Sequence, residues 1–305
     1  MVTKKVKKIT GVIIGPSGIG GVHLRELVNF GFQNIVLIGK KFKKNRILEL
    51  IKKYQNINFY NLKSIKEIKK FRPKLINICS PTKYHYDQIL ITKKFCRNLI
   101  VEKPILWINN KKKSNLEVIK NLLNGKNNNI FVNLPMISLA DQIKEKKKIL
   151  KVKTFDFNYF TKGKNQFENI PIDLLPHALS FLFTLNSNTL KNFKTISVLK
   201  KKNFWKCKIK INSCLCRFHF KQDFNRTNSR LSFKINDDYY LRKQIIKNDI
   251  YMNRILINEK KIIHVKNPMT DYLTLIFNNL DKKYVLRRNN NITLNSIKIM
   301  EKLIN

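Results

Sequence analysis

ITGVIIGPSGIGG, at residues 9–21, sets the fold of the first half of the chain. Residues 9–14 form a short apolar run, which is typical of a buried strand, and a glycine-rich turn follows at once. Apolar residues then recur at helical spacing up to residue 30, where Gly31 would end a helix. A strand, a tight turn and a helix in this order begin a βαβ unit.

The same alternation continues to about residue 134. It predicts further strands at residues 34–38, 57–60, 74–79, 98–101 and 129–133, and helices at residues 45–54, 65–70, 82–94 and 115–123. The strands are nearly continuous apolar runs, which indicates a parallel sheet covered on both faces. We therefore expect an α/β fold whose residues 1–134 form a doubly wound Rossmann domain that binds a dinucleotide.

The pattern changes after residue 135. Several segments now alternate apolar and polar residues, as half-exposed strands do. Strands are predicted at residues 152–160, 193–199, 205–211, 215–220, 231–235, 251–257 and 261–265, and helices at residues 139–148, 172–183, 271–280 and 292–304. We expect an α+β domain with a mainly antiparallel open sheet over residues 135–305, whose last helix could pack back on the first domain.

The composition restricts the class of protein. The chain has 305 residues, 43% of them hydrophobic, which suits two packed domains and not a disordered chain. Its formal net charge is +43, but lysines are spread along the whole chain and arginine is scarce beside lysine. Because Asn, Ile, Phe and Tyr are also abundant, the bias of an AT-rich genome explains this charge, and we expect no specific nucleic-acid partner. A lysine-rich nucleic-acid binder is the alternative.

Other sequence features point to a cytoplasmic protein with reduced thiols. Glycines interrupt the apolar run that follows the basic N-terminus, so no signal peptide is expected, and no run of about 18 apolar residues predicts a membrane span. Cys207, Cys214, Cys216 and His219 could collect a metal, but their spacing fits no zinc site. We expect buried strand cysteines and no metal.

The glycine-rich turn has the residues that a pyrophosphate needs. The GxGxxG spacing would use Gly15, position 17 and Gly20; Ser17 occupies the middle position and Gly18 follows it. Small residues let the phosphates approach the helix N-terminus closely. We assign this role to Gly15, Ser17, Gly18, Ile19 and Gly20, with an ordinary βα turn as the alternative.

The end of the second strand favours NADP(H) over NAD(H). An acidic residue commonly binds the adenosine ribose there, but this chain has Gly39, Lys40 and Lys41 after the strand. A cation such as Lys40 would suit a ribose 2′-phosphate.

Four further motifs follow one another along the chain. They are GIGGVH at residues 18–23, Ser80-Pro-Thr-Lys-Tyr-His85, Glu102-Lys-Pro104 and Asp173-Leu-Leu-Pro-His177. In this order they resemble the glucose–fructose oxidoreductase/inositol dehydrogenase (Gfo/Idh/MocA) family, and residues 291–303 resemble its closing helix. The resemblance covers nearly the whole chain.

The resemblance implies a site at the carboxyl ends of the parallel strands. There it adds a set of cofactor-binding residues to the glycine turn: Ser80, Pro81, Thr82, His85, Glu102 and Lys103. It places Lys103 near the nicotinamide, where a lysine can also polarise a carbonyl; a solvated surface lysine is the alternative.

The resemblance makes His177 the acid/base group and gives Asp173 contacts to substrate and His177. Residues four apart on a helix share a face, and a carboxylate can fix the tautomer of an imidazole. A surface ion pair or a core histidine is the alternative. Because Pro176 would disturb a helix interior, the helix could instead begin near His177.

These features predict an NAD(P)-dependent oxidoreductase that transfers hydride between nicotinamide and a CH–OH group of a sugar, polyol or nucleotide-sugar-like small molecule. A non-catalytic dinucleotide-binding sensor or scaffold is the alternative. In the family the C-terminal sheet often mediates oligomers, so a homo-oligomer is expected there. Leu134–Ile137 and Leu175 depart from the family pattern near the substrate pocket, and the substrate, the direction of reaction and the oligomeric state stay open.

Overall fold

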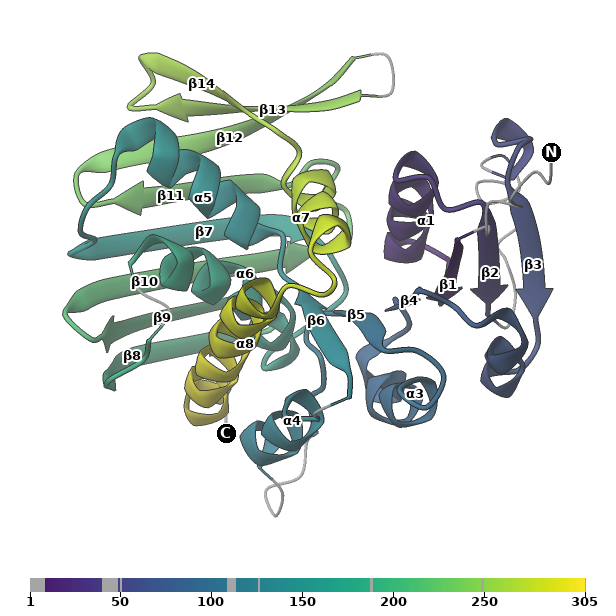
Figure 1. Cartoon of the computed structure of the whole chain (residues 1–305). Helices are drawn as coiled ribbons and strands as arrows, with labels where there is room; N and C mark the ends of the chain where they lie inside the picture. The colour runs from purple at the N-terminus through teal and green to yellow at the C-terminus, as the bar shows by residue number, and fades with distance from the viewer. Residues whose placement is uncertain are drawn as a thin grey trace. The chain divides into compact units, whose positions relative to one another are not determined.

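The structure is a computed structural model that describes residues 9–39, 49, 51–108, 114–125, 127–186, 189–247 and 250–304. The chain forms two compact units (Figure 1). The first unit comprises the chain up to Ile108, together with Ile119–Asn133 and Leu273–Leu286. The second unit comprises Asn109–Val118, Leu134–Tyr272 and Arg287–Asn305. Two short segments, residues 114–118 and 273–286, therefore group with the unit that is not their neighbour in sequence.

The first unit contains a six-stranded sheet in the order β3-β2-β1-β4-β5-β6. Its strands are β1 (Thr10–Ile14), β2 (Asn34–Ile38), β3 (Asn58–Leu62), β4 (Leu75–Ile78), β5 (Asn98–Glu102) and β6 (Asn129–Asn133). All neighbouring strands are parallel. The predicted doubly wound sheet is confirmed, and its order reverses between β1 and β4, where such sheets bind their ligands.

Short helices connect these strands. They are α1 (Ile19–Asn29), the 3₁₀ helices η1 (Ile65–Phe71) and η2 (Thr82–Tyr84), α3 (His85–Thr92) and α4 (Asn115–Leu123). Leu24 and Leu27 of α1 are fully buried, and Gly31 adopts a φ of 93° just after the helix, as its predicted role as a helix end requires. Of the helix expected over residues 45–54, residues 49 and 51–53 are helical, Tyr54 is not, and residues 45–48 and 50 lie outside the described residues.

The second unit contains an eight-stranded sheet in the order β14-β13-β12-β11-β7-β10-β9-β8. Its strands are β7 (Thr154–Lys162), β8 (Phe193–Lys201), β9 (Phe204–Ile211), β10 (Cys214–Asp223), β11 (Arg230–Ile235), β12 (Asp238–Lys247), β13 (Ile250–Ile257) and β14 (Lys261–Val265). Only the β7–β10 pair among these neighbours is parallel, so the mainly antiparallel sheet is confirmed. Strand β12 was not predicted from the sequence. It is stabilised by antiparallel pairing with β11 on one side and β13 on the other.

Helices α5 (Met136–Lys147) and α6 (Asn169–Leu185) cover one face of this sheet (Figure 1). Aromatic rings fill the space between α6 and the strands. The Phe181 ring of α6 lies 5.7 Å from that of Phe155, 5.9 Å from that of Phe157 and 4.8 Å from that of Phe233, measured between ring centroids. Burial of these large apolar surfaces stabilises the second unit.

Helix α6 continues through Pro176. The expectation that the helix could begin near His177 is therefore wrong. A proline inside a helix removes one backbone hydrogen bond, but Pro176 and most of its helical neighbours are buried. Packing of the apolar residues against the sheet outweighs the lost hydrogen bond.

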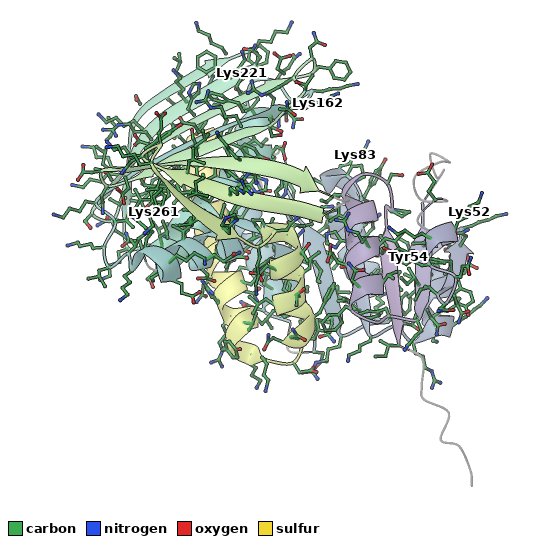
Figure 2. All side chains as sticks on the ribbon, turned by 90° about the horizontal axis from the view of Figure 1, so that it is seen from above. Lys52, Tyr54, Lys83, Lys162, Lys221 and Lys261 are labelled. Carbon is green, nitrogen blue, oxygen red and sulfur yellow. The ribbon has the colours of Figure 1, made fainter. Side chains whose placement is uncertain are left out.

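The remaining elements are α7 (Pro268–Asn278) and α8 (Lys283–Ile304), both longer than the sequence predicted. Within the described part of the chain, no helix is long and apolar enough to cross a membrane. Lysine side chains project from both units, among them Lys52 and Lys83 from the first and Lys162, Lys221 and Lys261 from the second (Figure 2).

We predict that Phe181→Ala lowers the free energy of unfolding of the second unit by about 3–5 kcal/mol, because it leaves a cavity among three other rings. Urea denaturation followed by tryptophan fluorescence measures this, since Trp205 is buried in the same unit. Leu150→Ala is the control, because Leu150 is 95% exposed and its removal should change stability little. Equal losses for the two variants would contradict the described core.

Candidate cofactor site and catalytic residues

The turn after β1 is built on three glycines. Gly15 has a φ of 80° and Gly18 a φ of 60°, a region of backbone conformation that disfavours residues with a Cβ. The Gly15 amide donates a hydrogen bond to the Ile38 carbonyl of β2 at 2.8 Å, which fixes the turn against the neighbouring strand. Gly18, which follows Ser17 in the turn, is the N-cap residue of α1.

Two of these glycines leave no room for a side chain. A Cβ on Gly20 would lie 2.1 Å from the Gly15 carbonyl oxygen, and a Cβ on Gly15 would lie 2.7 Å from the Ser80 amide nitrogen. A Cβ on Gly18 would meet nothing within 4 Å. Gly15 and Gly20 therefore hold the turn close to the end of β4, whereas the surface at Gly18 is open.

The N-terminus of α1 is suited to an anion. No side chain caps it, and its first turn contains no acidic residue. Ser17, Gly18 and Ile19 are exposed there. An uncapped helix end presents amide hydrogens and the positive end of the helix dipole, which together favour a phosphate. The turn therefore fits the pyrophosphate of a dinucleotide.

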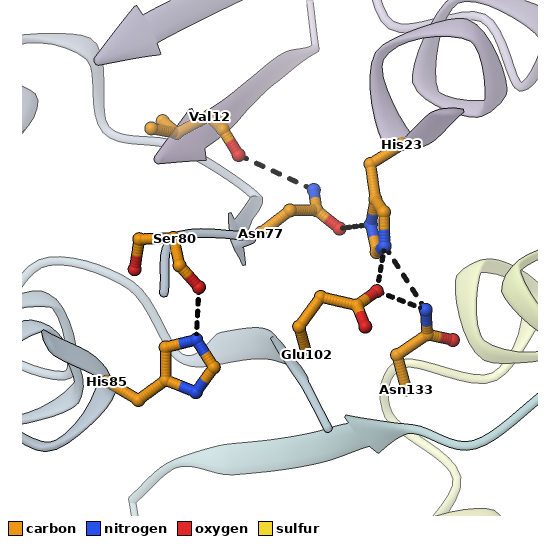
Figure 3. A network of polar contacts seen from close by, with 7 residues as sticks. All are labelled: Val12, His23, Asn77, Ser80, His85, Glu102 and Asn133. Carbon is orange, nitrogen blue, oxygen red and sulfur yellow. Dashed lines mark hydrogen bonds and ion pairs between the residues drawn. The ribbon is translucent and has the colours of Figure 1, made fainter. Parts of the chain in front are cut away.

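A buried polar network lies beside this turn (Figure 3). His23 of α1 is fully buried; its Nε2 lies 2.8 Å from Glu102 Oε1 and its Nδ1 lies 3.0 Å from Asn77 Oδ1. Asn133 Nδ2 donates to Glu102 Oε1 at 2.6 Å, and Asn77 Nδ2 donates to the Val12 carbonyl at 3.4 Å. The network joins α1 to the four strands β1, β4, β5 and β6.

The network stabilises opposite charges on His23 and Glu102. Burial by itself would lower the pKa of His23, but the Cys79 sulfur and the Glu102 carboxylate raise that pKa well above its usual value. Burial opposes ionisation of Glu102, but the hydrogen bond and charge of His23, with Asn133 and Lys103, lower the pKa of Glu102. The two groups therefore form a buried ion pair at neutral pH. The Glu102 side chain points into this network.

The turn after β4 is tied to the segment after β5 by His85. This ring is 1% exposed; its Nε2 lies 2.7 Å from the Ser80 carbonyl, and its Nδ1 lies 3.2 Å and 3.1 Å from the carbonyls of Pro104 and Ile105. The imidazole therefore faces backbone oxygens of its own domain on both sides. Pro81 is exposed and Thr82 half-buried at the start of η2, so these two reach the surface of the turn.

Lys103 follows the last residue of β5 and is half-buried. Its backbone is held between the Glu102 network and the Pro104 and Ile105 carbonyls that face His85. Its charge also contributes to the lowered pKa of Glu102. The two buried histidines of this domain thus fix the chain on either side of Lys103.

In the second unit, Asp173 and His177 lie one turn apart on α6. Asp173 Oδ2 accepts hydrogen bonds from Gln222 Nε2 at 2.6 Å and from Asn165 Nδ2 at 3.2 Å. The half-buried ring of His177 meets the Tyr159 ring edge to face, with 5.7 Å between centroids. Gly163 leaves the space that the Gln222 amide fills, because a Cβ there would lie 2.5 Å from Gln222 Oε1.

The sequence that forms this parallel sheet and its glycine turn matches the model of a known family. Residues 9–134 match the Gfo/Idh/MocA oxidoreductase family with an NAD-binding Rossmann fold. The first domain belongs to the Gfo/Idh/MocA family. None of the curated proteins compared matches the sequence significantly.

Solved structures share the fold of the whole chain. The dehydrogenase MviM from Clostridium difficile has 17% identity and a TM-score of 0.67, with 98% of this chain and 99% of that chain covered. A UDP-N-acetylglucosamine 3-dehydrogenase from Acidithiobacillus ferrooxidans has 10% identity and a TM-score of 0.68, with 97% and 96% covered. A 3-ketoreductase variant from Actinomadura kijaniata, solved with TDP-benzene and NADP, has 8% identity and a TM-score of 0.69, with 97% of each chain covered.

The departures from the Gfo/Idh/MocA pattern are buried. Leu175 is fully buried on α6, and Leu134, Met136 and Ile137 are at most 4% exposed around the start of α5. These side chains pack in the core of the second unit. Lys40, the residue on which the preference for NADP(H) rests, lies outside the described residues.

The sequence did not single out the polar residues that hold the candidate groups. Asn77, Asn133 and Gln222 are all buried, and each stands within or at the end of an otherwise apolar strand face. Gln222 continues the inward series of β10, after Cys216, Phe218 and Phe220. A polar residue at a position of a strand that faces the interior is the signal that could have identified them, because a buried polar group needs a hydrogen-bond partner.

Among the described residues, no three His, Cys, Asp or Glu side chains gather as a metal site. Cys214 and Cys216 lie on the buried face of β10, with their sulfurs 3.7 Å apart, whereas His219 lies on the opposite face. The strand therefore separates the residues that the sequence could have combined as ligands.

We predict that Gly20→Ala destabilises the first domain by about 1–3 kcal/mol or distorts its dinucleotide turn, because the new Cβ collides with backbone. The control is the adjacent Gly21→Ala, whose Cβ would have 3.7 Å to its nearest neighbour. A gain of up to about 1 kcal/mol is expected there from better helix propensity. Urea denaturation compares the two, and equal stabilities would contradict the described turn.

We predict that His23→Gln lowers the free energy of unfolding by about 3–5 kcal/mol in weakly acidic solution, because Glu102 then loses its buried partner. The pKa of His23 is raised above 6.5 in the folded state, so its contribution is fully present below 6.5 and is lost as the pH rises through the folded-state pKa. Glu102 acts in the opposite sense, and its contribution is lost as the pH falls through its lowered pKa.

Urea denaturation from about pH 5.5 to about pH 9 measures this dependence. The difference between the parent protein and His23→Gln should shrink steadily above pH 6.5. His264→Gln is the control, because His264 is exposed on β14. A difference that is independent of pH would show that His23 carries no charge in the folded protein.

Proposed function

We propose that the protein is an NAD(P)-dependent oxidoreductase acting on a CH–OH group of a sugar, polyol or nucleotide-sugar-like small molecule. The observation that carries the proposal is the glycine turn, in which Gly15 and Gly20 admit no side chain and a helix without a side-chain cap begins at Ile19. Its domain belongs to an NAD-binding oxidoreductase family. A turn with this clearance and this exposed helix end fits a pyrophosphate.

The first domain supplies the groups that would hold the dinucleotide. Ser17, Gly18 and Ile19 would bind the pyrophosphate through backbone amides. Gly15 and Gly20, whose amides donate to the carbonyls of Ile38 and Ser17, would contribute by leaving the turn without side chains. The turn at Ser80, Pro81 and Thr82 lies at the carboxyl end of β4, on the edge of the sheet where α/β proteins bind ligands. His85 and Glu102 would act from the interior, because both are buried and hold the backbone around these contacts. When bound, the nicotinamide would give or accept the hydride.

Lys103 and His177 are proposed as the catalytic residues. The Lys103 ammonium would donate a hydrogen bond to the substrate oxygen and stabilise the negative charge that develops on it. His177 would take the hydroxyl proton in oxidation and return it in reduction. Asp173, on the same face of α6, would orient His177 or bind a neighbouring substrate hydroxyl. Hydrogen bonds from Gln222 and Asn165 would hold its carboxylate in place.

Nucleotide sugars are the substrate class that the comparisons favour. Two of the similar structures are a UDP-N-acetylglucosamine 3-dehydrogenase and a 3-ketoreductase solved with TDP-benzene. The net charge of +43 also favours a phosphorylated substrate over a neutral one. For the cofactor we retain NADP(H) on the basis of Lys40, although similar structures have been solved with NAD⁺ as well as with NADP.

A thermal-shift comparison tests cofactor binding first. We expect NADP(H) to raise the unfolding temperature more than NAD(H) does, because a ligand at about 100 times its Kd stabilises the folded state by about 2.7 kcal/mol. A larger shift with NADH than with NADPH would reverse the preference. No shift with any of the four would remove the proposed function.

Turnover of UDP- and TDP-sugars, free sugars and inositols then tests the chemistry. We expect Lys103→Met and His177→Asn each to lower kcat by about 10²–10⁴ while the dinucleotide thermal shift is kept. The controls are Lys93→Met and His264→Asn, which change an exposed lysine and an exposed histidine in the same two units. Binding of dinucleotide without turnover of any substrate would support a sensor or scaffold instead.

A further inference from the structure

The turn after β1 is wedged between the ends of two neighbouring strands. In the sheet β1 lies between β2 and β4, so the chain that leaves β1 passes between their carboxyl ends (Figure 1). On the side of β4, a Cβ on Gly15 would come within 2.7 Å of the Ser80 amide nitrogen. On the side of β2, the Gly15 amide donates to the Ile38 carbonyl at 2.8 Å. The turn therefore cannot shift away from β2 without pressing on Ser80 and breaking the hydrogen bond to Ile38.

Pro16, the next residue of the turn, lies against Gly39, which follows the last residue of β2. Pro16 is buried, whereas Gly39 is exposed. A Cβ on Gly39 would lie 3.1 Å from Pro16 Cδ, which is closer than ordinary contact between two carbon atoms. Because Cδ is bonded to the backbone nitrogen in the proline ring, rotation of the side chain cannot move it away. Position 39 therefore accommodates a side chain only with strain.

Position 39 is where a Rossmann domain recognises the adenosine ribose. An acidic side chain after the second strand binds the ribose hydroxyls of NAD(H), and the same carboxylate would repel the 2′-phosphate of NADP(H). This chain has glycine at that position, and Pro16 crowds any side chain that could replace it. The shape of the turn thus disfavours the contact on which NAD(H) binding commonly depends.

We propose that Pro16 is a specificity-determining residue of the dinucleotide site. Together with Gly39, it keeps the carboxyl end of β2 free of a ribose-binding carboxylate and so favours NADP(H) over NAD(H). This inference rests on the proposed function, because it requires that the glycine turn binds a dinucleotide. It does not use the charge of Lys40, since Pro16 acts through the space that it occupies. An acidic residue at position 39 should therefore improve NAD(H) binding only when Pro16 is replaced as well.

A cycle of stability measurements tests the contact itself, without any ligand. Gly39→Ala adds only a Cβ, and Pro16→Ala removes the Cδ that this Cβ would meet. We expect Gly39→Ala to lower the midpoint of urea denaturation in the parent protein and not to lower it in Pro16→Ala, because the two positions are in contact. Equal effects in both backgrounds would show that Pro16 does not restrict position 39, which would overturn the proposal.

Titration with NADPH and with NADH, followed by the fluorescence of the reduced nicotinamide, then measures selectivity. The parent protein should bind NADPH more tightly than NADH. Gly39→Asp should weaken NADPH binding at least about tenfold through charge repulsion, without improving NADH binding. Pro16→Ala/Gly39→Asp should bind NADH about 10–100-fold more tightly than Gly39→Asp does, because its carboxylate can then accept hydrogen bonds from the ribose hydroxyls.

The matched control is Gly125→Asp, which adds the same charge at an exposed position of the first unit. Gly125 lies between α4 and β6, at the amino ends of the strands, and its Cβ would have 3.7 Å to the nearest neighbour. Its affinities for both dinucleotides should stay within about twofold of those of the parent, because distant surface charges are screened. The ligand-free denaturation midpoint of each variant shows whether it is folded.

The outcomes separate this proposal from the proposed function. A parent protein that binds neither dinucleotide would remove the proposed function, and this proposal with it. If the parent binds NADPH, but Gly39→Asp gains as much NADH affinity as the double variant does, only the role of Pro16 is overturned. A parent that binds NADH more tightly than NADPH would likewise overturn this role and leave the oxidoreductase proposal in place.

Discussion

Contact of backbone with backbone at the first turn is the constraint on which the first domain depends. Gly20 lies so close to the Gly15 carbonyl, and Gly15 so close to the Ser80 amide, that neither position admits a Cβ. This closeness brings the end of β1, the start of α1 and the end of β4 together. The residues at the start of α1, Ser17, Gly18 and Ile19, are exposed, and such a helix end suits a phosphate.

The buried His23–Glu102 pair lies in the interior beside this turn and links α1 to the strands of the sheet. An ion pair inside a domain is costly to form unless its remaining hydrogen-bonding positions are filled, and Asn77 and Asn133 provide partners here. His85 provides a second support by facing the carbonyls of Ser80, Pro104 and Ile105. Lys103 lies between the two supports, so its backbone position is determined by residues in the interior. This rigidity would suit the catalytic role that we propose for Lys103.

The two faces of the sheet in the second unit carry side chains of different chemical character. Rings and apolar side chains fill the face under α5 and α6, whereas lysines and three partly exposed rings occupy the other. Strand alternation produces this separation, because successive side chains point to opposite sides of a sheet. Within this sheet, lysines of β9 and β10 such as Lys206, Lys208 and Lys221 therefore lie on the same face as rings from neighbouring strands.

The sequence by itself determined the elements whose pattern is local. Continuous apolar runs, glycine-bounded helices and the strand–turn–helix at residues 9–29 predicted the six-stranded sheet and the glycine turn. The mainly antiparallel sheet was also predictable, because half-exposed strands alternate visibly. Such patterns extend over a few residues and so can be recognised without knowing any neighbour.

Only the tertiary structure decided features that depend on distant partners. Strand β12 forms because β11 and β13 pair with it, and α6 runs through Pro176 because its apolar side packs on the sheet. Gln222 meets Asp173 across 49 positions, and Glu102 meets His23 across 79. Neither contact leaves a local signal, because it depends on the register and packing of segments far apart in the chain.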